Sequence, residues 1–365
     1  MRQSLVLASG LFLFGLSVVL AQDASPAAAS TDQLLLEART KAQVEDALAQ
    51  GAHLEARDFQ GLTALSLAAR YGSLERAQVL VAHGANLEAR DNARYTPLMW
   101  AASAGELEIV KLLASHGARL EATGKDGHTA LYWAGEERHS EVVAELIRRG
   151  ATIQRMDRMH LPFHNDWRAL GVAAGEGNLE VVRLLLDHGM STEVRDDDNT
   201  PLHCAAFSGK VGVAALLMER GAHLEPKNEL LMTPLMVAAD QGQVKMIRLL
   251  LDKGAKLDAH AGRCPSGENC SYEGATALMI AAGEGRVEAM RVLLQKGAAV
   301  EARDKRGWTA LMEAADRGQM EVLQLLLEKG ADVNARTRDG YTALYWAVLE
   351  KHPQAAELLK EHGAR

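Results

Sequence analysis

Residues 309–336 read TALMEAADRGQMEVLQLLLEKGADVNAR, and this stretch decides the fold of most of the chain. Leu311, Ala314 and Ala315 recur at steps of three and four, which places them on one face of a short helix. The leucine-rich run that follows predicts a second helix. We expect that helix to end at Gly330, because glycine adopts the left-handed conformation of a helix end at little cost. One such pair of helices cannot bury its apolar face alone, so we expect it to pack against similar neighbours.

The same pattern returns along the chain at a period near 33 residues, which is the sequence signature of a stacked repeat array. Eight copies open on Thr-Ala-Leu or Thr-Pro-Leu, at Thr63, Thr96, Thr129, Thr200, Thr233, Thr276, Thr309 and Thr342, and a ninth opens on Arg168. Twenty-one residues after each opening position comes a glycine: Gly84, Gly117, Gly150, Gly189, Gly221, Gly254, Gly297, Gly330 and Gly363. Positions within a copy are numbered below from its opening residue, so that Gly330 is at +21.

These copies resemble the ankyrin repeat, and the resemblance covers roughly residues 31–365. It implies an all-α repeat solenoid, an array of helix-turn-helix units with hairpin fingers and about nine full repeats. Residues 31–51 lack the Thr-x-Leu opening and are predicted to form an N-terminal capping unit. The last helices are predicted to be polar at their outer face, through Glu350, Lys351, Glu357, Lys360 and Glu361. An array closed at both ends is expected to be a monomer, and the resemblance implies protein partners.

Residues 1–21 differ in composition from the repeats, because Arg2 precedes an almost uninterrupted apolar run. This pattern is typical of a secretory signal peptide, and we expect cleavage after Ala21. The alternative is an uncleaved anchor, for which about 16 apolar residues are short. Residues 22–30 are rich in Ala, Ser and Pro and are predicted to be a tether before the repeat domain of residues 31–365. We expect a periplasmic or secreted protein, with a bacterial host preferred and no membrane insertion after removal of the leader.

The charge of the chain argues against two classes of partner. Its 40 Lys and Arg residues against 48 Asp and Glu residues give a formal charge of −8. Removal of residues 1–21 takes away Arg2 and no acidic residue, which lowers the charge by one to −9. Phosphate groups are bound by basic surfaces, so we expect neither nucleic acid nor an anionic membrane as the partner.

The segment between each glycine and the next opening residue varies in length, whereas the helices do not. Six of these segments span twelve residues and one spans eleven. Two are longer, with eighteen residues from Gly150 to Arg168 and twenty-two from Gly254 to Thr276. In the ankyrin family this segment is the hairpin finger beside the concave surface. Both insertions therefore fall on the edge that the family uses for binding.

Side chains opposite the core-facing positions are predicted to line the groove. If +2, +5 and +6 face the core, then +4, +7 and +8 face the groove and −1 lies on the finger. All five tryptophans fall on these positions, and exposed aromatic residues are enriched at binding hot spots. The predicted partner-binding residues are Tyr95, Trp100, Trp133, Trp167, Phe207, Asp240, Gln241 and Trp308, with Phe163 in the first insertion. We expect the footprint to centre between the two insertions and not on Trp346. The alternative is that these aromatic residues pack against neighbouring repeats.

The cysteines suggest a rigid loop. Cys264 and Cys270 lie inside the second insertion, and in an exported protein such a pair is expected to form a disulfide. A metal site with His260 is the alternative, although two thiols and one imidazole are an incomplete zinc set. Cys204, at +4, lies outside this pair and is interpreted as a small residue shielded between helices, with a reactive thiol in the groove as the alternative.

The first insertion carries His160 and His164 together with two aspartates, Asp157 and Asp166. Pro162 prevents the two histidines from sharing a regular helix, which disfavours a metal site there. We expect a solvated finger with an apolar tip instead.

Catalytic motifs are missing from the sequence: it contains no Gly-x-Ser-x-Gly, no His-Glu-x-x-His, no phosphate-cradling loop and no dinucleotide fingerprint. We therefore predict no catalytic residues, no cofactor and no metal. The expected function is a non-catalytic protein–protein interaction module of the cell envelope, which binds an exported partner in its concave groove. Similar periplasmic ankyrin proteins of bacteria suggest an inhibitor or self-protection (immunity) role against a cell-wall hydrolase or toxin. The alternative is a metal-binding or redox-active periplasmic protein that uses the His and Cys residues of the insertions.

Overall fold

The computed structural model describes residues 30–152, 168–195, 198–262 and 273–365, and in these ranges it is the predicted all-α repeat solenoid. Each unit consists of a short first helix, a tight turn and a second helix of nine residues. The first helices are α1 (Thr31–Glu37), α3 (Ala64–Arg70), α5 (Pro97–Ala104), α7 (Ala130–Glu136), α9 (Arg168–Glu176), α11 (Pro201–Phe207), α13 (Pro234–Asp240), α15 (Ala277–Gly283), α17 (Ala310–Asp316) and α19 (Ala343–Leu349). The second helices are α2 (Lys41–Ala49), α4 (Leu74–Ala82), α6 (Leu107–Ser115), α8 (Ser140–Arg148), α10 (Leu179–Asp187), α12 (Val211–Glu219), α14 (Val244–Asp252), α16 (Val287–Gln295), α18 (Met320–Glu328) and α20 (Pro353–Glu361).

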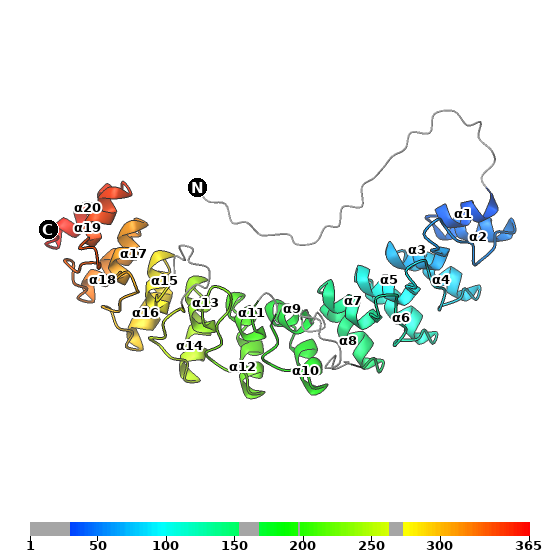
Figure 1. Ribbon diagram of the computed structural model, residues 1–365, viewed down its shortest axis with the longest axis horizontal. Helices are drawn as coiled ribbons and strands as arrows, with labels where there is room; N and C mark the ends of the chain where they lie inside the picture. Colours follow the sequence, from blue (N-terminus) through cyan, green and yellow to red (C-terminus); the bar gives the residue numbers. More distant parts are fainter. Residues whose placement is uncertain (1–29, 153–167, 196–197, 263–272) are drawn as a thin grey trace, which may run out of the picture.

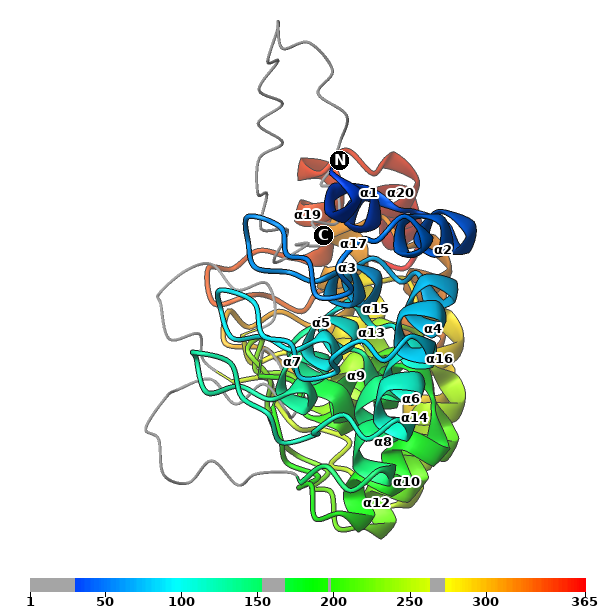
Figure 2. The same ribbon diagram turned by 90° about the vertical axis from the view of Figure 1, so that its right-hand side faces the viewer.

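The helix pairs stack in chain order into a curved row. In Figure 1 the first helices lie on the concave side of the arc and the second helices on the convex side, most clearly from α11 to α16. The view in Figure 2 shows the described loops between repeats projecting on one side, away from the second helices. The first helices therefore line the groove, and the fingers stand along one edge of it, as the ankyrin resemblance implied.

Local chemistry fixes where each helix begins and ends. The opening threonine caps its first helix: the Thr96 hydroxyl accepts a hydrogen bond from the main-chain N–H of Met99 at 3.4 Å. Pro97 occupies the next position, where a helix needs no N–H donor. At the other end of the unit Gly330 has a φ of 82°, the left-handed conformation that a side chain would strain. The glycines at +21 of the other copies share this conformation.

The core runs the full length of the row. Leu311 is 2% exposed and Ala314 and Ala315 are fully buried, which confirms the core-facing positions +2, +5 and +6. Small residues at +5 and +6 allow successive first helices to approach closely, so that the cores of all the repeats merge into one cluster.

Polar bonds between fingers also connect successive repeats. The guanidinium of Arg90 donates to the carbonyl oxygen of Thr123 at 2.8 Å. The carboxylate of Glu88 accepts from the N–H of Arg119 at 2.7 Å. The same Glu-x-Arg element recurs before other opening residues, and its bonds cross to the next repeat about 30 residues on. Charged side chains thus tie these described fingers to the ones that follow them.

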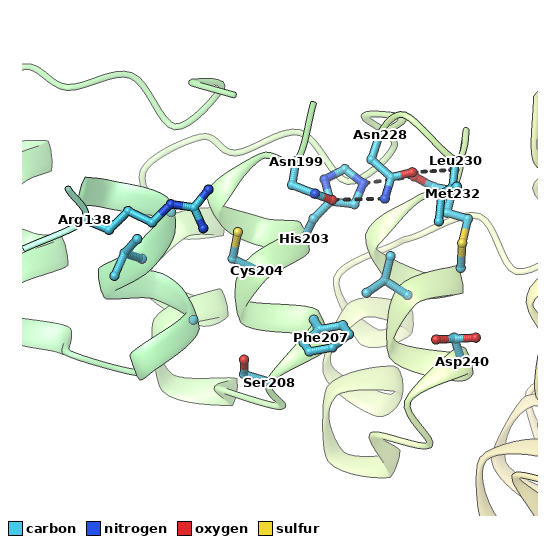
Figure 3. A pocket seen from close by; sticks show the side chains of 14 residues that line it. Arg138, Asn199, His203, Cys204, Phe207, Ser208, Asn228, Leu230, Met232 and Asp240 are labelled. Atoms are coloured by element: carbon cyan, nitrogen blue, oxygen red, sulfur yellow. Dashed lines mark hydrogen bonds between the residues drawn. The ribbon is translucent and has the colours of Figure 1, made fainter. Parts of the chain in front are cut away.

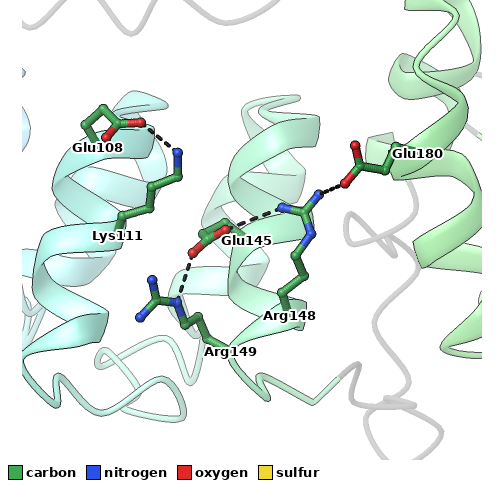
Figure 4. Close-up of polar contacts among 6 residues, drawn as sticks. All are labelled: Glu108, Lys111, Glu145, Arg148, Arg149 and Glu180. Carbon is green, nitrogen blue, oxygen red and sulfur yellow. Dashed lines mark hydrogen bonds and ion pairs between the residues drawn. The ribbon is translucent and has the colours of Figure 1, made fainter.

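Ion pairs on the convex side hold α8 and α10 together across the first insertion. Glu145 accepts from Arg149 at 2.9 Å and pairs with Arg148 at 3.4 Å on its own helix, as Figure 4 shows. The other end of the Arg148 guanidinium pairs with Glu180 of α10 at 2.8 Å. This network lies on the second helices and therefore outside the groove.

The two ends of the array differ. Ser30, which the sequence assigned to the tether, caps α1 by accepting from the N–H of Gln33 at 3.2 Å. Residues 1–29 lie outside the described residues, so the predicted signal peptide stays a prediction. In the described ranges no helix combines the length and hydropathy needed to cross a membrane. The five charged residues predicted for the outer face of the last unit are all exposed, but Val348 and Leu349 of α19 are also 60% and 49% exposed, so this end is partly apolar.

Candidate partner-binding groove

Three successive first helices enclose a hollow in the floor of the groove. The +4 positions of α9, α11 and α13 are Val172, Cys204 and Val237, and these side chains form part of its lining. The hollow measures about 420 Å³, and Figure 3 shows the side chains that surround it. It lies in the fourth to sixth full repeats, where the sequence predicted the centre of the footprint.

The +7 positions of the same helices form one rim and explain why the hollow is open. Phe207 of α11 is 55% exposed, which is unusual for a phenylalanine. Before it in the row stands Gly175 of α9, which has no side chain to cover the floor. A Cβ atom built on Gly175 would lie 3.8 Å from the Cβ of Cys204, an ordinary contact distance. After Phe207 in the row comes Asp240 of α13.

The fingers supply the opposite rim, and hydrogen bonds hold its side chains in place. Asn228 donates from Nδ2 to the side-chain oxygen of Asn199 at 3.0 Å and accepts from the N–H of Met232 at 2.9 Å. The Nε2 of His203 lies 2.9 Å from the carbonyl oxygen of Met232 and donates to it. The Nδ1 of His203 then accepts from the N–H of Thr200 at 3.2 Å. These bonds hold the side chains of Asn199, Asn228 and His203 in the wall.

His203 is a structural residue of this wall. Both of its ring nitrogens are engaged, and it is 1% exposed. Burial lowers the pKa of His203 to about 4, so the ring is neutral at physiological pH. A buried neutral imidazole with two backbone partners is not placed to act as an acid or base on a bound molecule.

Asp240 and Gln241, both predicted partner-binding residues, lie together at the end of α13. The amide of Gln241 donates to Oδ2 of Asp240 at 2.6 Å. The nearby guanidinium of Arg286 bonds the main-chain carbonyl of Asp240 at 2.8 Å, not the carboxylate. Burial raises the pKa of Asp240, because a half-buried carboxylate loses solvation, and this effect outweighs the opposite influence of the Gln241 hydrogen bond and of the Arg286 and Arg317 charges.

Tyr95, Trp100 and Trp133 come together on the N-terminal side of the hollow. The ring of Tyr95 meets those of Trp100 and Trp133 edge to face, at centroid distances of 5.6 and 5.4 Å. Tyr132 and His128 continue the cluster by stacking at 3.5 Å. All three predicted residues are half-buried. Packing between repeats, the alternative reading of these aromatic residues, accounts for a large part of their surface.

Trp308 differs from the expectation of an exposed aromatic residue. It is 7% exposed, because the guanidinium of Arg306 covers one side at 4.2 Å and the ring of Trp346 lies at a centroid distance of 4.6 Å. Little of Trp308 remains for a partner to contact.

A charged cluster follows the hollow on its C-terminal side, and the sequence analysis missed it. Arg306 pairs with Asp304 at 2.7 Å and with Glu313 at 2.8 Å, and Arg317 pairs with Glu284. Burial raises the pKa of Glu313 to about 7, against the opposite influence of Arg306 and Arg317. Glu313 is at +4, where the other copies have apolar residues, and this difference was the signal in the sequence for the charged cluster.

Several predicted residues lie outside the described residues: His160, Phe163, His164, Trp167, Cys264 and Cys270. The disulfide and the metal alternatives at the insertions therefore stay predictions. His260, at the base of the second insertion, donates from Nδ1 to the carbonyl of Gly274 at 2.6 Å. Within the described part of the chain no group of three or more His, Cys, Asp and Glu side chains is placed to hold a metal ion.

Comparison with known proteins agrees with this geometry. The family model for ankyrin repeats in three copies matches residues 33–124, 89–157, 156–228, 225–304, 264–337 and 299–365. A serine/threonine-protein kinase 12 of Arabidopsis thaliana is 43% identical over 56 residues, which is 15% of this chain and 12% of that protein. A protein fem-1 homolog A of Bos taurus is 44% identical over 57 residues, 15% of this chain and 9% of that protein. The similarity thus spans about a tenth of each relative.

Proposed function

The chain belongs to the ankyrin repeat family, and on that premise we propose that it is a non-catalytic module that holds another exported protein in its concave groove. Ankyrin repeats indicate a protein–protein interaction module. The proposal adds where the partner sits, in which compartment it is found and what the binding achieves.

The observation that carries the proposal is the hollow below Phe207. A folded groove normally covers its apolar floor, yet here Phe207 is 55% exposed beside a space of about 420 Å³. Large exposed aromatic side chains next to a pocket are typical of the anchors that dominate binding energy. Neighbouring aromatic residues, such as Trp100 and Trp133, are already engaged by Tyr95. We therefore centre the footprint on α9, α11 and α13.

The envelope role rests on the sequence of residues 1–30, with its apolar leader and short tether. In that compartment a groove that holds another protein suits the neutralisation of a secreted protein, such as a cell-wall hydrolase or a toxin. Inhibition and self-protection are the proposed outcome of binding.

The test is affinity capture from an envelope extract of the host, with the tagged chain as bait. Phe207→Ala removes the exposed ring, and Gly175→Leu fills the hollow from the same rim, one repeat earlier. Loss of a buried aromatic anchor costs about 2 kcal/mol, or roughly thirtyfold in affinity. We expect one protein to be recovered with the wild-type chain and lost with either variant.

Leu349→Ala is the matched control. Leu349 is also at +7 of its copy and is 49% exposed, but it lies in the last repeat. Recovery should be unchanged with this variant. Equal recovery with Phe207→Ala and Gly175→Leu would show that the hollow is not the binding site. A captured partner without an export signal would contradict the envelope role, and a captured hydrolase that stays fully active in the complex would contradict inhibition.

A further inference from the structure

The hollow has a basic residue at one end and an acidic residue at the other. Arg138 lines the end near α7, and Asp240 lines the end near α13. Between them lie Val172, Cys204 and the exposed ring of Phe207. In Figure 3 the guanidinium of Arg138 and the carboxylate of Asp240 stand on opposite sides of the apolar centre.

Asp240 is the unusual member of this set. It is half-buried, and its carboxylate accepts from the neutral amide of Gln241. No ion pair of this carboxylate occurs among the residues that the structure describes. Arg286 donates to the main-chain oxygen of the same residue, and the charges of Arg286 and Arg317 both favour the ionised carboxylate, but burial outweighs them. Burial disfavours the charged form of Asp240 in the free protein, as its raised pKa indicates. An incoming cation would remove that penalty.

We propose that the hollow receives an apolar side chain and, beside it, a lysine or arginine from an exposed loop of the partner protein, with the cationic group paired to Asp240. This inference rests on the proposed function and names the chemistry of the partner at the same site. The cationic group also lies over the face of Phe207, which attracts positive charge within about 6 Å of its centroid.

The geometry also sets the spacing of the two side chains. Successive first helices lie about 8–10 Å apart. An extended chain advances about 3.3 Å per residue. The apolar residue sits over Cys204, one repeat before Asp240, so the basic residue follows or precedes it by two or three positions. The occupant is thus a short basic and apolar sequence on a protruding loop.

The probe is a phage-displayed library of disulfide-closed seven-residue random peptides, selected on the full chain. We expect the selected peptides to share a lysine or arginine two or three positions from an apolar residue. Their affinity should fall at least tenfold with Asp240→Asn and with Phe207→Ala. Asp316→Asn is the matched control, because Asp316 is also at +7, is half-buried and has a raised pKa, but does not line the hollow. It should change affinity less than twofold. Selection on Asp240→Lys should enrich acidic residues at the same place.

The outcomes separate the two proposals. Peptides that need Phe207 but bind Asp240→Asn as well as the wild type overturn this inference and leave the groove assignment standing. Two results would overturn the proposed function together with the inference. One is that the selected peptides bind equally well after Phe207→Ala and Gly175→Leu, and the other is that the library yields no peptide whose binding depends on the groove. Circular dichroism and melting of each variant confirm that the helices are intact.

Discussion

Trp100 donates from its indole nitrogen to Oδ2 of Asp91 at 3.0 Å, a bond that fixes the ring against its own finger. The other oxygen of Asp91 accepts from the main-chain N–H of Tyr95 at 2.8 Å. One repeat later the same position is Gly124, and the indole nitrogen of Trp133 is buried without a partner among the described residues. Tyr95 fills the space, because a Cβ on Gly124 would come within 2.4 Å of its ring. Trp100 and Trp133 occupy the same repeat position, but only the indole nitrogen of Trp100 donates a hydrogen bond among the described residues.

The two tryptophans are expected to respond differently to the same substitution. Trp100→Phe breaks a hydrogen bond to a carboxylate and leaves Asp91 under-bonded, which costs about 1.5–3 kcal/mol of folding stability. Trp133→Phe breaks no hydrogen bond and removes a buried donor, so its cost should stay within about 1 kcal/mol. Urea unfolding followed by circular dichroism measures both.

Asp91→Asn supplies the control for this comparison. Asp91→Asn should lower the free energy of unfolding more in the wild type than in the Trp100→Phe variant, since the two residues are bonded and their effects are not additive. A Trp133→Phe loss equal to that of Trp100→Phe would mean that the Trp133 nitrogen has an acceptor, such as bound water.

His203 predicts a loss of stability in mild acid. Its pKa is lowered by burial to about 4 in the folded chain, against about 6.5 when unfolded. Below pH 6.5 His203 therefore binds a proton in the unfolded chain but stays neutral in the folded chain, so the free energy of unfolding decreases as the pH falls. The stability that His203 contributes is complete above pH 6.5 and is lost progressively down to pH 4. The shift corresponds to about 3 kcal/mol.

His203→Met isolates this contribution, because the chain itself places methionine at the equivalent position of other copies, for example Met99 and Met236. The variant should be less stable than the wild type at pH 7, since it loses the bond to Met232. The stability difference between the two proteins should shrink between pH 7 and pH 4. A constant difference across this range would show that His203 titrates normally in the folded chain.

Gly175 is expected to lower the free energy of unfolding relative to alanine at the same position. Glycine inside a helix costs about 0.5–1 kcal/mol relative to alanine, and a Cβ at this position meets nothing closer than 3.8 Å. Gly175→Ala should therefore raise the free energy of unfolding by about that amount while it narrows the hollow. Chemical denaturation tests the gain. A destabilised variant would mean that the floor of the hollow has less room than these distances imply.

The fold was predictable because its signals are local and repeated. The Thr-x-Leu opening, the core positions and the glycine at +21 each determine a helix cap, a buried face or a turn within one unit. Ser30 and Val348 show where this reasoning weakens, because the outer units have a neighbour on one side only. Stacking positions there are not constrained by a next repeat.

The candidate site was less predictable because exposure depends on side chains in other repeats. Position −1 alone does not show that Trp308 is covered by Arg306 and Trp346. In the same way, Phe207 is exposed because the preceding copy has Gly175 at its +7 position. That glycine was visible in the sequence, but its effect on a neighbouring repeat requires the stacking geometry.

The second insertion is expected to be dispensable for folding, because the finger closes below it. The N–H of Ala261 donates to the carbonyl of Ala275 at 2.9 Å, and the N–H of Gly274 donates to Ala261 at 3.2 Å. An uninterrupted finger shows the same pair of bonds, from Asp304 to Trp308 and from Gly307 to Asp304, each at 3.0 Å. The described residues on both sides of the insertion therefore keep the ordinary geometry of a finger base.

Deletion of residues 263–272 joins Gly262 to Glu273 and leaves three residues between Ala261 and Ala275, the same number as between Asp304 and Trp308. Loop length contributes little to stability, about 0.6 kcal/mol for each doubling. The deletion should therefore change the free energy of unfolding by no more than about 1 kcal/mol, and Cys264→Ser should change the melting temperature even less. Partner binding should weaken in both, because the finger borders the groove. Differential scanning calorimetry and the capture assay separate the two effects. A large loss of thermal stability would mean that the insertion packs onto the solenoid, and unchanged capture would exclude it from the binding surface.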